Sequence, residues 1–145
     1  MGKLTEENEV QKELIELTLQ ELGTALKGKK SNAAVLGMAT YVHNFYSGIE
    51  NILKRILNVN RIKFNTNSAS WHKDLINTAM SKKIISETLY LKLDEYLVFR
   101  HFFVHAYGVR IRFDRFRDLA KDAQNVWNEF YSQVEPIILK LDKDN

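Results

Sequence analysis

The residues best suited to chemistry lie close together near the end of the longest helical pattern in the chain. One arginine, two histidines and a tyrosine interrupt an aromatic and aliphatic run at Arg100, His101, His105 and Tyr107. Histidine can move protons near neutral pH. Arginine can hold a phosphate through two parallel hydrogen bonds and stabilise the charge that develops on it. This set suits metal-free cleavage of RNA, because the 2′-hydroxyl of RNA supplies an internal nucleophile.

The spacing of these residues predicts a helix from about Ser86 to Tyr107 with two apolar faces. One stripe consists of Leu89, Leu93, Tyr96, Leu97, Phe103, Val104 and Tyr107. Arg100 falls within that stripe, where a charge must be paired, hydrated or used. A second face carries Leu91, Val98 and Phe102, next to the histidine pair. We therefore expect this helix to need two partners, one of which is another copy of the chain.

A structural explanation stands beside the chemical one. Arg100 could reach solvent or pair with a carboxylate such as Glu50, leaving both histidines structural. Glu50 lies among apolar neighbours, so its sequence position is compatible with a buried carboxylate or with an exposed helix residue. The neighbours Trp71 and His72 could stack a base, or the indole could pack the protein with the histidine at its surface.

Composition indicates an all-α protein with a single domain over residues 1–145. Six glycines and one proline are too few to interrupt long helices often. Cysteine is absent, which removes thiol nucleophiles and disulfides and suits the cytoplasm. No run reaches the roughly 18 apolar residues of a membrane span, and the N-terminus lacks the apolar core of a signal peptide.

The pattern predicts five helices and little other structure. We expect them over 5–27, 31–57, 71–81, 86–107 and from 114 onward, with a brief extended segment over 109–113 and a loose tail at 142–145. The first helix should pack through Val10, Leu14, Leu17, Leu22, Ala25 and Leu26. Gly48 and other small residues of the second helix would let a neighbouring helix approach closely. Pro136 should kink or fray the last turns of the fifth helix.

A basic segment follows the proposed reactive residues. It contains Arg110, Arg112, Arg115 and Arg117 together with two aspartates, Asp114 and Asp118. These arginines could hold an RNA backbone, or they could form a solvated face that pairs locally with the aspartates. The net charge of +3 does not by itself identify a nucleic-acid binder.

Several other chemistries lack their motifs. There is no H-E-x-x-H and no acidic cluster at ligand spacing, so no metal site is predicted. Neither a glycine-rich phosphate loop nor a G-x-S-x-G elbow is present, so no cofactor is expected.

The segment Arg100-x4-His105-x-Tyr107 resembles the R-x4-H-x-Y signature of HEPN-domain toxins, the HepT-like ribonucleases of HEPN–MNT toxin–antitoxin pairs. The similarity extends to HNFYSGIENIL (43–53), WHKDLI (71–76) and EYLVFRHFFVHAYG (95–108), in the same order. It covers roughly residues 30–140. One departure is Val104 inside the motif, where many relatives are expected to carry a basic residue; this could lower affinity for RNA.

The resemblance implies a helical bundle that dimerises so that two motifs face one cleft. It implies a metal-independent ribonuclease with Arg100 and His105 as the essential pair and His101 in support. Transfer RNA is the first expected target and messenger RNA the second. It also implies a partner antitoxin, a minimal nucleotidyltransferase that silences the toxin by transferring AMP from ATP onto Tyr107.

Two other functions remain open. The chain could be a non-catalytic HEPN accessory domain that binds RNA or a nucleotidyltransferase, although such a domain has no need for an intact Arg-His-Tyr set. It could also be a structural helical module that binds a small ligand, which predicts a closed apolar cavity rather than an open basic cleft.

Overall fold

The structure is a computed structural model that describes residues 2–64, 70–105 and 111–144. Predictions about Tyr107, Gly108 and Arg110 lie outside the described residues. The elements are α1 (Lys3–Lys27), α2 (Asn32–Val59), α3 (Trp71–Ser81), α4 (Glu87–His105), the short 3-10 helix η1 (Phe113–Arg115) and α5 (Arg117–Asp144). The described part of the chain contains no strand, so the all-α prediction is confirmed.

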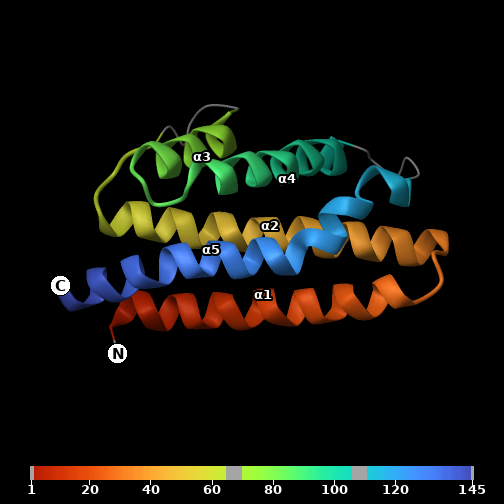
Figure 1. The fold of residues 1–145 in the computed structure, drawn as a ribbon, viewed down its shortest axis with the longest axis horizontal. Helices are drawn as coiled ribbons and strands as arrows, with labels where there is room; N and C mark the ends of the chain where they lie inside the picture. Colours follow the sequence, from red (N-terminus) through yellow and green to blue (C-terminus); the bar gives the residue numbers. More distant parts are fainter. Residues whose placement is uncertain (1, 65–69, 106–110, 145) are drawn as a thin grey trace.

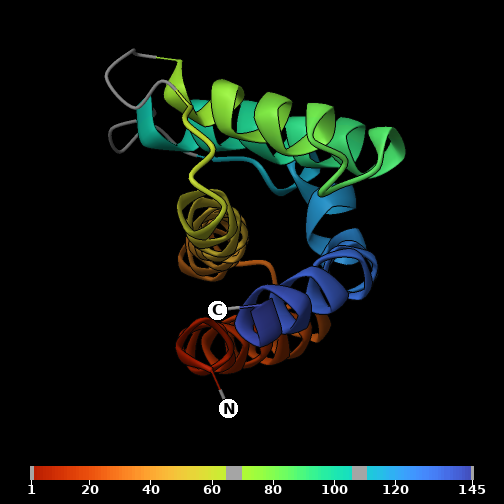
Figure 2. The same cartoon turned by 90° about the vertical axis from the view of Figure 1, so that its left-hand side faces the viewer.

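The long helices α1, α2 and α5 run side by side, and α3 and α4 lie together across α2 (Figures 1 and 2). Both chain termini lie at the same end of the molecule. One contiguous apolar core joins all five α-helices, and its largest fully buried side chains include Trp127, Tyr46, Tyr96, Phe45 and Phe130. No described helix is long and apolar enough to cross a membrane.

Two of the helices begin where the sequence predicted them, and a serine hydroxyl caps each one. The Ser31 hydroxyl accepts a hydrogen bond from the Ala34 amide at 3.1 Å and caps α2. The Ser86 hydroxyl accepts from the Leu89 amide at 3.1 Å at the start of α4. The predicted start of the last helix at Asp114 is wrong, because that residue lies in η1 and α5 begins at Arg117.

The stripe predicted to bury α1 is right in its second half and wrong in its first. Leu22 is buried and Ala25 and Leu26 pack against the core, whereas Val10, Leu14 and Leu17 are exposed. The buried residues of the helix are Leu4, Asn8, Ile15, Leu19 and Leu22. Both faces have helical spacing, so the sequence of α1 could not decide between them. The packing against α2 decides it, because the position of a Cβ added to Gly48 would lie only 2.6 Å from Ile15 Cγ1.

The end of the chain is more ordered than expected. α5 continues through Pro136 to Asp144 instead of ending in a loose tail. The Asp142 carboxylate accepts hydrogen bonds from the Leu4 amide at 3.2 Å and from the Thr5 amide at 2.6 Å, and it also accepts from the Thr5 hydroxyl. Asp142 therefore satisfies amide groups in the first turn of α1 that have no partner within the helix.

Candidate functional site

The last two turns of α4 carry three of the residues singled out by their chemistry. Arg100 is half-buried, whereas His101 and His105 are exposed. The structure therefore places all three on one short stretch of helix, with the arginine turned toward the protein and the histidines toward solvent. The fourth residue of the set, Tyr107, lies outside the described residues.

The two histidines are neighbours on the surface of α4. Their ring centroids are 4.4 Å apart, and Nδ1 of His105 lies 2.8 Å from the backbone oxygen of His101. A carbonyl oxygen can only accept a hydrogen bond, so Nδ1 of His105 carries the hydrogen. In the neutral ring Nε2 is then the nitrogen able to take up a proton. This hydrogen bond fixes the orientation of the His105 ring and makes Nε2 its basic nitrogen.

The charge of Arg100 acts on a buried carboxylate, Glu50, although no ion pair within 4.0 Å joins the two side chains. Nε of Arg100 is buried and makes no hydrogen bond among the described residues. Glu50 of α2 is only 3% exposed, so of the two arrangements that its sequence position allowed, the buried one is correct. Oε2 of Glu50 lies 2.7 Å from Nδ1 of His72, the second residue of α3. Residues from α2, α3 and α4 thus form one polar cluster.

Electrostatics indicate how the protons of this cluster are held. Burial raises the pKa of Glu50 to about 7, opposed by the positive charge of Arg100. Burial, followed by the positive charge of Arg100, lowers the pKa of His72 to about 4. At neutral pH His72 is therefore neutral, and its contact with Glu50 is a hydrogen bond rather than an ion pair of two full charges.

Tyr46 completes the cluster from one turn away on α2. Its hydroxyl is buried and makes no hydrogen bond of normal geometry among the described residues. It lies near enough to Glu50 that the two groups shift each other's pKa, and burial is the largest cause that raises the pKa of Tyr46. The phenol therefore stays protonated. Sequence reasoning singled out Glu50 through its apolar neighbours, and helical spacing places Tyr46, four residues earlier, beside it. No sequence signal brings His72 to Glu50.

Trp71 packs within the protein. Its ring centroid lies 3.5 Å from that of His72 and 6.5 Å from that of Phe64, and Lys54 Nζ lies 4.9 Å from its centroid. These contacts support the packing role for the indole. They also hold the His72 ring in place beside Glu50.

The second apolar face of α4 is uncovered in the single chain. Val98 is 65% exposed and Phe102 43%, and Leu91 is also exposed. The predicted stripe of α4 differs from the structure at two described residues: Phe99, which it omitted, is buried, and Val104, which it included, is exposed.

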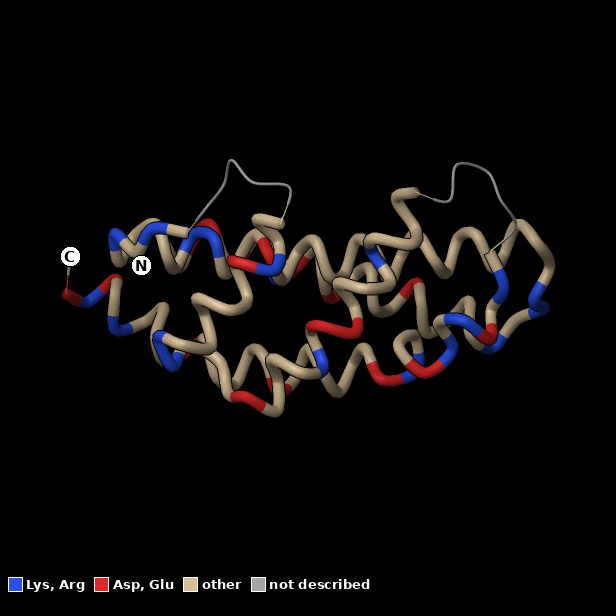
Figure 3. The backbone as a smooth tube through the Cα atoms, turned by 90° about the horizontal axis from the view of Figure 1, so that it is seen from above, with Lys and Arg blue, Asp and Glu red and all other residues tan. Residues whose placement is uncertain are grey.

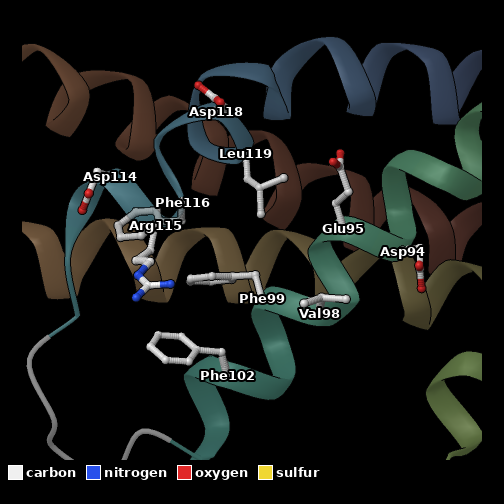
Figure 4. A pocket seen from close by; sticks show the side chains of 10 residues that line it. All are labelled: Asp94, Glu95, Val98, Phe99, Phe102, Asp114, Arg115, Phe116, Asp118 and Leu119. Atoms are coloured by element: carbon white, nitrogen blue, oxygen red, sulfur yellow. The ribbon is translucent and has the colours of Figure 1, made fainter.

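A pocket of about 520 Å³ adjoins this uncovered face. Figure 4 shows Arg115 pointing toward the rings of Phe99 and Phe102, with four carboxylates around the rim: Asp94, Glu95, Asp114 and Asp118. The pocket is formed by α4, η1 and the start of α5. It combines an apolar floor with charged edges, as protein–protein interfaces do.

The basic segment after α4 contains a locally paired arginine, and a lysine from another part of the chain lies beside it. Arg112 pairs with Asp114 at 3.0 Å, as the local-pairing explanation predicted for this arginine. The Arg117 guanidinium lies 5.3 Å from the centroid of the Phe113 ring, and Lys30 Nζ lies 5.5 Å from the same ring. Lys30, in the turn between α1 and α2, thus adds a cation to this surface. Figure 3 shows Lys and Arg segments at this end of the bundle and also at the opposite end, near the termini.

A comparison with known proteins agrees with this geometry. The family model described as HepT-like protein matches residues 37–140, which include the whole of α3, α4 and η1. No match was found among curated proteins or among solved structures. The family match covers well over half of the chain and includes the Arg-His segment of α4. The chain belongs to the family of HepT-like proteins, whose fold is the helical HEPN fold.

Proposed function

We propose that the protein is a metal-independent endoribonuclease toxin that acts in the cytoplasm as a homodimer. Arg100 binds and stabilises the reacting phosphate, His105 transfers the proton, and His101 supports it. The observation that carries this proposal is the last two turns of α4, where a half-buried arginine lies beside two exposed histidines in a chain of the HepT-like family.

The geometry fits the chemistry of RNA cleavage. His105 is exposed, and the carbonyl of His101 sets its tautomer, so Nε2 can remove the proton of a 2′-hydroxyl. The Arg100 charge lies within the same two turns and can stabilise the negative charge that develops on phosphorus oxygens. Transfer RNA is the first candidate substrate and messenger RNA the second.

The uncovered face of α4 supports a dimer. Leu91, Val98 and Phe102 are apolar and exposed beside the Phe99–Arg115 pocket, an arrangement suited to contact with a second chain. A two-fold arrangement through this face would bring two copies of α4 together. The two Arg-His pairs would then border one cleft.

Substitution of the reactive pair tests the nuclease. His105→Ala and Arg100→Ala should each reduce RNA cleavage about 10²–10⁴-fold without loss of helicity. Cleavage by the wild-type protein should persist in EDTA. A folded His105→Ala protein with the wild-type rate would show that the proton-transfer assignment is wrong, and loss in EDTA that added metal restores would exclude the metal-free mechanism.

The RNA-contact role of Arg110, Arg112, Arg115 and Arg117 is part of the proposal. The paired Arg112 should contribute least. Replacing both Arg115 and Arg117 with Ala should weaken RNA binding and lower the slope of log affinity against log salt by about 0.7 for each lost phosphate contact. Lys140 and Lys143, exposed near the far end of α5, provide a matched double substitution. An equal slope in both double variants would favour the solvated face.

Regulation is proposed to act through Tyr107. A nucleotidyltransferase antitoxin would join the tyrosine oxygen to the α-phosphate of ATP and release pyrophosphate. The bulky, negative AMP group would lie two residues beyond His105 and would oppose RNA binding. Incubation with the cognate enzyme, ATP and Mg²⁺ should raise the intact mass by whole AMP units as cleavage falls. Tyr107→Phe should stay active and unlabelled; labelling of this variant would move the site elsewhere.

The alternative is a non-catalytic accessory domain that binds RNA or a nucleotidyltransferase. The exposed apolar face and the basic segment are compatible with it. It differs in one measurable respect: purified wild-type protein would bind its partner but cleave no RNA.

A further inference from the structure

A polar cluster lies in the middle of an otherwise apolar core, between α2, α3 and α4. It consists of Tyr46, Glu50, His72 and Arg100, and only the last belongs to the Arg-His-Tyr motif. The rings of Tyr46 and Tyr96 stack with centroids 6.5 Å apart, and Glu50 and Arg100 each lie one turn further along their helices. The charge of Arg100 acts on both Tyr46 and Glu50.

Of the described core residues, Asn8 and Glu50 are the only buried ones with polar or charged side chains. Asn8 donates to the Leu4 carbonyl within α1, so it has a local structural role. Glu50 has no such local role within α2.

The cluster is unfavourable for stability. A buried carboxylate loses hydration that hydrogen bonds only partly replace. Two further polar atoms, Nε of Arg100 and the hydroxyl of Tyr46, are buried there without hydrogen bonds among the described residues. An apolar residue at position 50 would serve the bundle better. The cluster is therefore better explained by the neighbouring reactive arginine than by packing.

The carboxylate is held in one place by α3. Nδ1 of His72 lies 2.7 Å from Oε2 of Glu50, and the Trp71 ring stacks on the imidazole. α3 is itself fixed on α4 by the Lys73–Asp94 ion pair at 2.6 Å and by a hydrogen bond from the Tyr90 hydroxyl to Asn77 at 2.6 Å. The negative end of the cluster is thus rigid relative to the helix that carries Arg100.

We propose that Glu50 is a positioning residue for Arg100. Its carboxylate, fixed by His72, is a buried counter-charge that makes no ion pair within 4.0 Å of Arg100 but attracts the guanidinium through space and keeps it against α2, with its terminal nitrogens directed to the phosphate. This proposal rests on the nuclease function proposed above. Glu50 is too deeply buried to touch RNA, so it acts through Arg100 and not on the substrate.

The first experiment follows the arginine itself and needs no nuclease activity. In ¹⁵N-labelled wild-type protein, the Nε–H signal of Arg100, identified by its loss in Arg100→Lys, should be sharp and protected from exchange with water. In Glu50→Gln it should broaden and exchange rapidly. A signal unchanged in a folded Glu50→Gln protein would overturn the proposal.

The second experiment measures cleavage. Glu50→Gln should lower kcat at least about tenfold, because the misoriented guanidinium stabilises the transition state less. The matched control is Glu13→Gln, which removes the same charge from an exposed position on α1 and should leave kcat unchanged. A structural role for Glu50 would instead lower the melting temperature together with the rate. The proposal predicts a lower rate at an equal or higher melting temperature.

A second pair of variants covers the case in which Glu50→Gln does not fold. His72→Ala removes the group that fixes the carboxylate and should loosen Arg100 and lower kcat. His72→Asn keeps a donor near the position of Nδ1 and should restore part of both. Equal rates in wild type and a folded His72→Ala would contradict the proposal. If the wild-type protein cleaves no RNA, the nuclease function fails, and the NMR measurement alone decides whether Glu50 positions Arg100.

Discussion

Buried and half-buried polar side chains have different roles in the two parts of the molecule. In the three-helix part formed by α1, α2 and α5, Asn8 and Asp142 bind backbone groups near the start of α1. Where α3 and α4 cover α2, Glu50 instead binds a side chain, His72, beside the half-buried Arg100. The first arrangement completes a helix end. The second places the Glu50 carboxylate in the middle of α2, where there are no unpaired backbone groups for it to bind.

The exposure of aromatic side chains also differs between the two parts. Phe130 of α5 is completely buried, whereas Phe102 of α4 is 43% exposed beside Val98. The aromatic side chains of the long helices are buried or half-buried, although the aliphatic Val10, Leu14 and Leu17 of α1 are exposed. The end of α4 instead combines a half-buried charge, Arg100, with an exposed aromatic ring, Phe102.

The largest expected effect compares these two phenylalanines. Phe130→Ala should lower the free energy of unfolding by about 3–5 kcal/mol, because it leaves a cavity in the core. Phe102→Ala should change it by roughly 0.5 kcal/mol or less, since much of the ring is already in water. Chemical denaturation of both variants at low protein concentration measures the difference.

Dimerisation of the same two variants, Phe102→Ala and Phe130→Ala, gives a second comparison of the two rings. Phe102→Ala should weaken the proposed dimer in analytical ultracentrifugation, whereas Phe130→Ala should affect it only through unfolding. Similar losses of stability in the two variants would mean that Phe102 belongs to the core of the single chain, and the contrast between the two parts would fail.

The next effect concerns the buried carboxylate and depends on pH. The folded state raises the pKa of Glu50 from 4.5 to about 7, so the ionised form is penalised. The contribution of Glu50 to stability is therefore full below pH 4.5 and is lost as pH rises through 7. Glu50→Gln should be more stable than wild type at pH 8, by up to about 3 kcal/mol, and equally stable at pH 4.

Urea unfolding at the two pH values gives this difference directly. His72 has a lowered pKa and destabilises the protein as pH falls from 6.5 toward 4, but it is present in both proteins and largely cancels. A Glu50→Gln protein that is less stable than wild type at pH 8 would show that the ionised carboxylate stabilises the fold.

The smallest effect is expected at the α1 cap. Hydrogen bonds from Thr5 lower the pKa of Asp142, so this group stabilises the protein above its unfolded pKa and the benefit is lost in acid. Asp142→Ala should increase hydrogen exchange at the Leu4 and Thr5 amides while the exchange of α4 amides stays the same. Unchanged exchange at Leu4 and Thr5 would mean that the cap does not order the helix in solution.

Much of the fold was predictable because its signals are local. Helical periodicity and scarce helix breakers indicated long helices, and Ser31 and Ser86 predicted where two of them begin. The motif in α4 was also local: Arg100 and His105 are five residues apart, so any helix brings them within two turns of each other. The dimer, the substrate and the roles of these residues remain proposals.

The tertiary structure decided what local signals could not. Two faces of α1 had helical spacing, and only the close approach of Ile15 to Gly48 selected one. Glu50 was recognisable as an unusual residue, but its contact with His72 spans 22 positions, and no periodicity encodes such a pairing. The sequence by itself determined the helices and the reactive motif. Packing between helices determined which surfaces stay open and which charge faces Arg100, because burial depends on neighbours that are distant in the chain.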